Sequence, residues 1–225
     1  MNHEHVVVRV WDLPTRFFHW AMVCLMAALW WSADAGEMEY HQLFAYGLMI
    51  LLVFRICWGF VGSESARFSH FVRGPKTALA YLKQLKQSGV TSHLGHNPLG
   101  AYMVICLMLL LSVQLVTGLF ATDDIFTEGP FYSYVSTEVA GSLTWLHKQN
   151  FNAILALTAI HIMAVVVHSL HGDKLIPAMV HGCKRVPQHL DVKLDFKPVT
   201  SAILILLCVA GVVLGMFMWP VLQVL

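Results

Sequence analysis

Histidine is the side chain in this sequence with the greatest capacity for chemistry, and it is unusually abundant. The 225 residues include 13 histidines, almost as many as the 14 lysines and arginines together. A neutral imidazole is the commonest metal ligand that proteins use. Ionisable side chains are costly inside apolar segments and are functional candidates there by default. Several histidines lie in or beside such segments, among them His19, His41, His147 and His161.

The segments that position these histidines are long and apolar enough to cross a membrane. Hydrophobic residues make up 57% of the chain and charged residues only 12%, whereas soluble domains carry about 25% charged residues. A helix of about 20 mostly apolar residues crosses a hydrocarbon core of about 30 Å. The sequence therefore predicts an all-α membrane protein whose first span is a retained signal anchor. The predicted spans are residues 17–33, 41–61, 99–121, 151–170 and 198–222.

Basic residues lie almost entirely on one side of the predicted spans. Thirteen of the fourteen precede the first span, end the second, or lie between the second and third or the fourth and fifth spans. The other side has Lys148 alone. By the positive-inside rule we expect a cytoplasmic N-terminus and an outer C-terminus. The same outer side carries seven carboxylates: Asp34, Glu37, Glu39, Asp123, Asp124, Glu128 and Glu138.

The four histidines form two pairs when their expected depths are compared. His19 lies near the cytoplasmic end of its span, and His41 near the outer end of the next. The fourth span has His147 at or just before its outer start and His161 fourteen residues later, about 21 Å further along a helix. Fourteen steps of about 100° fall about 40° short of four turns, so both face nearly the same way. We therefore expect an outer pair and an inner pair, each able to hold one haem b inside a four-helix bundle.

Other interpretations of these histidines stay open at this point. Each one taken alone could be a satisfied polar residue at a helix interface. A ligand at His168 instead of His161 would lie about 31 Å from His147 and push one haem into the headgroups, so we keep His168 as a neighbour of a haem edge or a quinone. A zinc site needs three or four converging ligands, and the two pairs do not converge. We expect the following histidines at the surface: His3, His5, His70, His93, His96, His181 and His189.

Two arginines are candidates for contact with the haem propionates. Arg16 and Arg55 lie at the cytoplasmic edge, where haem propionates would emerge, and guanidinium groups suit carboxylates. Contact with lipid headgroups is the alternative role for these two arginines.

Residues 65–88 interleave apolar and basic side chains, which predicts a cytoplasmic helix on the membrane surface, either a docking surface or a basic linker. Residues 122–146 are rich in Gly, Ser, Thr and acid. We expect them to cap the outer face, where an acidic surface suits a basic partner.

The cysteines exclude one way of attaching a haem. The chain has five cysteines and no Cys-x-x-Cys-His sequence, which excludes covalent attachment of a c-type haem. We expect five unpaired thiols. No flavin or dinucleotide motif is present, and we expect no nucleic-acid partner.

The motifs around the histidines resemble those of a known family. Residues 8–20, VRVWDLPTRFFHW, resemble the entry to the first helix of the bacterial cytochrome b561 and nickel-iron hydrogenase cytochrome b subunit superfamily. The resemblance continues with HQLFAYG and RICWG on the second span, and HNPLGAYMV and TGLFATDD on the third. On the fourth span, LH is followed fourteen residues later by IHIMAVVVH. The similarity covers about residues 8–184, and the fifth span is less informative.

The resemblance implies a cofactor, a function and a location. In that superfamily two low-spin haems b are bound by the histidines that match His19 with His161 and His41 with His147. It implies electron transfer in the bacterial inner membrane between the quinone/quinol pool and a periplasmic c-type cytochrome or hydrogenase. The chain would be an electron-transfer protein, with quinol oxidation as a candidate enzymatic activity. Arg16 and His168 are candidates for the quinone pocket.

Three alternative functions remain to be weighed. They are the membrane anchor of a Ni-Fe hydrogenase, a reductase of superoxide or another small oxidant, and a haem-free proton-coupled transporter. The transporter predicts broken helices or inverted repeats, which the sequence does not show. The expected organisation is a cytoplasmic segment 1–16, a diheme four-helix bundle 17–171, a cytoplasmic loop 172–197 and a fifth transmembrane helix 198–225.

Overall fold

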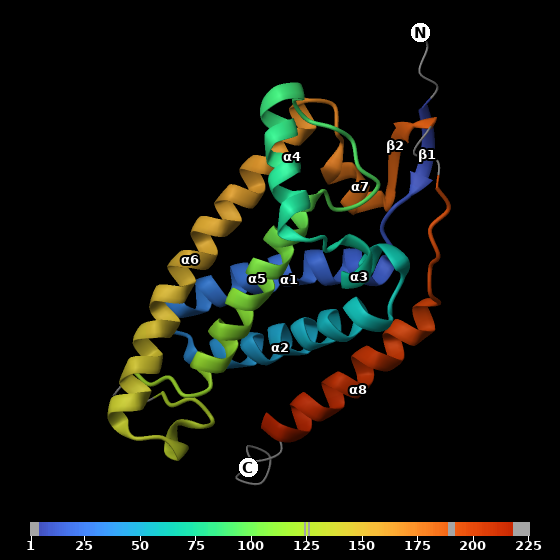
Figure 1. Ribbon diagram of the computed structural model, residues 1–225. Helices are drawn as coiled ribbons and strands as arrows, with labels where there is room; N and C mark the ends of the chain where they lie inside the picture. The colour runs from blue at the N-terminus through green and yellow to red at the C-terminus, as the bar shows by residue number, and fades with distance from the viewer. Residues whose placement is uncertain (1–4, 124, 126, 189–191, 218–225) are drawn as a thin grey trace. The chain divides into compact units, whose positions relative to one another are not determined.

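The computed structural model describes residues 5–123, 125, 127–188 and 192–217, and it divides into two compact units. Unit 1 comprises Met1–Trp20, Arg55–Ile105 and Ala159–Ile205. Unit 2 comprises Ala21–Phe54, Cys106–Thr158 and Leu206–Leu225. The five long helices labelled α1, α2, α5, α6 and α8 in Figure 1 contribute residues to both units and are described within each.

Long helices dominate the described chain, as the hydropathy pattern predicts. Four are long and apolar enough to cross a membrane. Their apolar side chains are largely exposed, for example Leu109 (61%) and Leu204 (64%), as expected of helices that face lipid rather than a protein core. These four are α2 (Met38–Val61), α5 (Pro98–Gly118), α6 (Thr137–Leu170) and α8 (Val199–Phe217).

The first predicted span is also a continuous helix, α1 (Leu13–Asp34). Its length is sufficient for a membrane, but it is not one of the four helices whose apolar stretch qualifies them as candidate spans, because three tryptophans and a histidine interrupt its aliphatic residues. That α1 crosses the bilayer therefore stays a proposal. Of the fifth predicted span, residues 218–222 lie outside the described residues.

Helix α6 begins earlier than the hydropathy pattern predicts. It starts at Thr137 rather than near residue 151, because polar helix-forming residues extend a helix beyond its apolar part. His147 therefore lies about three turns inside the helix rather than at its start. Residues 122–146 are only partly loop: Thr122 pairs with Glu128 in an isolated bridge, a short 3-10 helix η2 (Tyr132–Tyr134) follows, and α6 then begins.

In unit 1 the start of α1 is anchored by a buried carboxylate. Asp12 is 1% exposed, and its Oδ1 accepts the backbone N–H of Thr15 at 2.9 Å, which is the usual cap for the first turn of a helix. Its Oδ2 accepts the indole N–H of the fully buried Trp58 on α2 at 2.9 Å. One side chain thus sets where α1 begins and joins it to α2, which positions the residues on the first turns of α1.

Unit 1 also contains a small sheet that the hydropathy pattern does not predict. Strand β1 (His5–Arg9) pairs antiparallel with β2 (Cys183–Pro187), and the two lie side by side in Figure 1. The short helix α7 (Leu175–His181) leads into β2 through Gly182, which has a φ of 83°. The Gly182 carbonyl accepts the backbone N–H groups of Val10 and Trp11. The segment before α1 is therefore held by the loop that follows α6.

The linker after α2 is broken into three short helices rather than one. They are η1 (Glu64–Ala66), α3 (Phe68–Phe71) and α4 (Pro75–Ser88). Arg67 and Val72 adopt extended backbone conformations between them, and Pro75 begins α4, because proline is favoured in the first turn of a helix. The amphiphilic helix predicted for residues 65–88 is thus confined to α4, whose Leu79 is 60% exposed.

Candidate functional site

His41 and His147 come together in unit 2. His41 lies on α2 and His147 on α6, and their ring centroids are 6.4 Å apart with an interplanar angle of 74°. Two metal–nitrogen bonds of about 2.0 Å, with about 1.1 Å from each nitrogen to its ring centre, give a centroid separation of about 6 Å for imidazoles on opposite sides of one metal ion. The pair therefore fits axial ligation of one haem iron.

The Nδ1 atom of each ring in this pair is already engaged. The carbonyl oxygen of Leu29 lies 3.0 Å from Nδ1 of His41, and the Ser32 hydroxyl lies 3.3 Å from it. Because a carbonyl oxygen only accepts, the proton of His41 resides on Nδ1 and Nε2 is free to bind a metal. We call Leu29 and Ser32 the His41 clamp.

The second ring has an equivalent arrangement, the His147 clamp, formed by Gln114 and Thr117 of α5. The Gln114 carbonyl lies 2.9 Å from Nδ1 of His147, and the Thr117 hydroxyl 3.2 Å from it. Asn150, one turn further along α6, donates to the Gln114 side chain at 2.7 Å. Gly118 completes the contact, because a Cβ atom there would lie 3.0 Å from Cε1 of His147.

The other predicted pair, His19 and His161, lies in unit 1. The two imidazoles are close enough for their charged forms to repel each other. His19 is half-buried, and its Nδ1 is closed off from solvent with no hydrogen-bond partner among the described residues. A buried ring nitrogen without a partner is unusual in a folded protein, and His19 therefore has no counterpart of the two clamps among the described residues.

The two arginines predicted to face the propionates are held differently. Arg55 is 2% exposed, lies 5.1 Å from the centre of the Phe68 ring, and has one terminal nitrogen with no partner in the described part of the chain. Its burial argues against contact with lipid headgroups, and the orphaned donor fits a carboxylate of a bound group. Arg16 donates to the carbonyl of Val180, while its buried Nε has no partner. Both fit the predicted role, Arg55 with the stronger observation.

His96 is a residue of this region whose place the sequence reasoning missed. It was expected at the surface, but its Nδ1 is buried and has no partner among the residues described, and the centre of its ring lies 4.5 Å from that of Phe71 and 4.8 Å from that of Trp11. Burial and then the nearby Arg55 guanidinium, with His161 and His19, lower the pKa of His96 to about 3. It is therefore neutral near pH 7. Its position in the HNPLG motif, directly before α5, was the available signal.

His168 belongs to a buried charged cluster rather than to an open pocket. Its Nδ1 lies 3.3 Å from the carboxylate of Asp173, which also forms an ion pair with Lys184 and accepts the Ser92 hydroxyl. His168 and Asp173 are 8% and 7% exposed. These contacts give His168 a structural role at the end of α6, and they leave the quinone prediction for it without a supporting contact.

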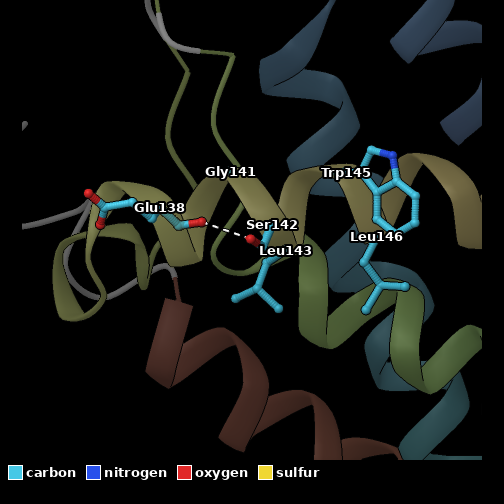
Figure 2. A pocket seen from close by; sticks show the side chains of 6 residues that line it. All are labelled: Glu138, Gly141, Ser142, Leu143, Trp145 and Leu146. Atoms are coloured by element: carbon cyan, nitrogen blue, oxygen red, sulfur yellow. Dashed lines mark hydrogen bonds between the residues drawn. The ribbon is translucent and has the colours of Figure 1, made fainter.

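Two surface hollows are present among the described residues. One lies over the first turns of α6, where Figure 2 shows Trp145 and Leu146 standing away from the helix and the Ser142 hydroxyl donating to the Glu138 carbonyl. None of the predicted site residues lines it. The second lies in unit 1 and is lined in part by Ser65 and His96, whose Oγ and Nδ1 atoms are buried and have no partner among the described residues. Its lining is Ser65, His70, Phe71, Arg73, Thr77, His93, Leu94, Gly95, His96, Pro98 and Leu194.

The family of the chain follows from comparison with known proteins. Residues 10–182 match the family model described as prokaryotic cytochrome b561. Comparison with curated proteins and with solved structures found no match. The matched residues include all four histidines of the two pairs, and they cover well over half of the chain. The chain therefore belongs to the prokaryotic cytochrome b561 family, membrane proteins that transfer electrons by means of b-type haem.

Proposed function

We propose that this protein carries electrons across the bacterial inner membrane, between the quinone pool and a periplasmic redox partner, using two bis-histidine haems b. The observation that carries the proposal is the 6.4 Å separation of the His41 and His147 rings, which belong to different helices. When bound, each haem iron accepts and releases one electron. With both axial positions taken by histidine, a haem has no open site for oxygen and serves electron transfer.

The proposed axial ligands are His41 with His147 and His19 with His161. Helix α6 supplies one ligand to each pair, and its rise separates the two by about 21 Å. The engaged Nδ1 atoms of the first pair, which leave Nε2 as the ligand atom, support these roles. Arg55 and Arg16 are the proposed partners of the haem propionates, supported by their buried nitrogens without partners.

The charge distribution supports the proposed orientation and the class of partner. The N-terminus is placed in the cytoplasm, because basic residues are kept on that side. The outer segment around Asp123, Glu128 and Glu138 then presents carboxylates to the periplasm, where a basic c-type cytochrome would dock by charge complementarity. A periplasmic hydrogenase is the alternative partner.

The second hollow in unit 1 is a better place for the quinone than Arg16 and His168. Its walls include Phe71, Leu94 and Pro98, which suit an apolar ring, and Ser65 and His96 offer polar atoms that have no other partner. The carbonyl oxygens of a quinone accept hydrogen bonds of the kind these groups can donate. His96 also interacts electrostatically with His161 and His19, so a quinone here would lie in the neighbourhood of the proposed haem ligands.

A haem-to-protein ratio tests the central claim. The purified protein should contain two haems b by a pyridine haemochrome assay, and His41→Ala or His147→Ala should reduce this to one. The matched control is His171→Ala, because His171 is exposed and contacts only the Val167 carbonyl within the structure described here; it should retain two. A colourless protein after expression with ample haem would contradict the proposal and favour the transporter.

A further inference from the structure

The two clamps share one construction although they lie on different helices. In each, a hydroxyl residue follows the carbonyl residue by three positions and lies within hydrogen-bond distance of that carbonyl: Ser32 of Leu29 at 3.1 Å and Thr117 of Gln114 at 3.1 Å. Thr117 has a second and shorter contact, 2.7 Å, with the Val113 carbonyl. Serine and threonine commonly bond a carbonyl one turn earlier in a helix, and donation to these carbonyls uses the single hydroxyl proton. The hydroxyl oxygen therefore faces the histidine Nδ1 as a second acceptor.

This construction affects the metal-binding nitrogen as well as the orientation of the ring. Two acceptors around one Nδ1–H hold the proton on that nitrogen and leave Nε2 as the ligand atom. Acceptors that attract the Nδ1 proton make the imidazole a more basic ligand. A more basic ligand stabilises oxidised iron more than reduced iron, which lowers the reduction potential of the bound group.

The surroundings of His19 and His161 should have the opposite effect on the reduction potential of a bound group. Nδ1 of His19 has no acceptor among the described residues, so this ligand lacks the same activation. We expect this difference to raise the potential of the site in unit 1 relative to the His41–His147 site.

We propose that Ser32 and Thr117 are positioning residues that fix the tautomer and basicity of His41 and His147, and that they make this site the lower in potential of the two. The inference rests on the proposed haem ligands. It goes beyond them because it assigns the order of the two potentials and the residues that set it.

The test is a redox titration of the haem absorbance in Ser32→Ala and Thr117→Val. Each variant should shift the lower-potential component upward by up to about tenfold in the ratio of oxidised to reduced haem, or about 59 mV for one electron. The higher-potential component should stay in place. Ser32→Thr and Thr117→Ser keep the hydroxyl and should restore the original potential, which a purely structural role would not require.

Ser112→Ala is the matched control. Ser112 lies on the same helix as Thr117 and donates to the Met108 carbonyl at 2.8 Å, but its hydroxyl contacts no histidine within the described residues. It should move neither potential. A shift of the higher-potential component, or an equal shift in the control, would overturn the inference. If His41→Ala removes one haem but the hydroxyl variants leave both potentials unchanged, the inference fails alone; if His41→Ala retains both haems, the proposed function fails first.

Discussion

The imidazoles of this protein differ in what surrounds them, and this difference separates their roles. His41 and His147 have an engaged Nδ1 and a free Nε2. His168 is committed to Asp173 at the end of α6. His96 is buried, unpartnered and neutral near pH 7, which suits a residue that donates one hydrogen bond to a neutral ligand. Residue type alone does not distinguish these cases.

Ser65 provides a test of the quinone location at the scale of one residue. Its hydroxyl is buried beside the hollow that contains His96 and has no partner, so Ser65→Ala removes a hydrogen-bond donor without enlarging the side chain. We expect the rate of haem reduction by added quinol to fall about tenfold, as for one lost hydrogen bond of about 1.4 kcal/mol, while haem content is unchanged.

Arg16 serves as the comparison for this prediction, because the sequence alone favoured it. Arg16→Gln should affect quinol-dependent reduction less than Ser65→Ala does. The reverse order would place the quinone near Arg16 instead and would contradict the assignment to the hollow.

At the scale of elements, helix α5 supports His147, the proposed outer haem ligand on α6. Gln114 and Thr117 orient His147, and Asn150 ties the two helices together through the Gln114 side chain and the Leu110 carbonyl. The exposed face of α5 is apolar. The polar residues of this helix therefore mark its contact with α6, which explains why an otherwise lipid-like helix contains glutamine and threonine.

A Gly118→Ala variant tests how closely α5 packs against the His147 ring. Because a Cβ atom would lie 3.0 Å from the His147 ring, Gly118→Ala should displace the ring by a few tenths of an ångström and cost about 1–3 kcal/mol. We expect one of the two haems to be lost or bound at reduced occupancy, measured by the haem-to-protein ratio. Gly211→Ala has open space at its Cβ position and should retain full haem. Equal ratios in both variants would show that Gly118 does not constrain His147.

For the whole molecule, the distribution of charge determines the proposed orientation in the membrane. Thirteen of the fourteen basic residues fall on one side of the predicted spans. Among them, Lys184 is 4% exposed and paired with Asp173, and Arg55 is buried. These two side chains are buried inside unit 1 rather than exposed at the membrane surface. In the proposed topology, the exposed basic residues are the ones that would hold their segments on the cytoplasmic side.

Reporter fusions measure this orientation directly. Alkaline phosphatase needs the oxidising periplasm to form its disulfides. A fusion after Gly129 should therefore be about tenfold or more as active as fusions after Gly89 or Gly172. Green fluorescent protein fused at the same three positions should give the opposite ranking. Activity after Gly89 comparable to that after Gly129 would contradict the proposed topology and remove the basis for a periplasmic partner.

Much of this molecule could be predicted from its sequence, because the relevant signals are local. A run of apolar residues long enough for a bilayer must be helical, since only a helix satisfies its own backbone groups in lipid. Four of the predicted spans accordingly correspond to apolar helices of sufficient length, and the family resemblance is confirmed by the match over residues 10–182. The pairing of His41 with His147 followed from helical rise and from charge bias, both of which can be read along the chain.

Contacts between segments that are distant in sequence were decided only by the tertiary structure. Hydropathy does not reveal that Leu29 and Ser32 face His41, that His96 is buried, or that β1 pairs with β2 across more than 170 residues. His96 looked like a surface residue because its neighbours are polar, but the side chains that cover it, Phe71 and Trp11, come from other segments. A sequence determines which groups are present and how helices expose them. The packing of those helices determines which group meets which, and with it the tautomer and basicity of each imidazole.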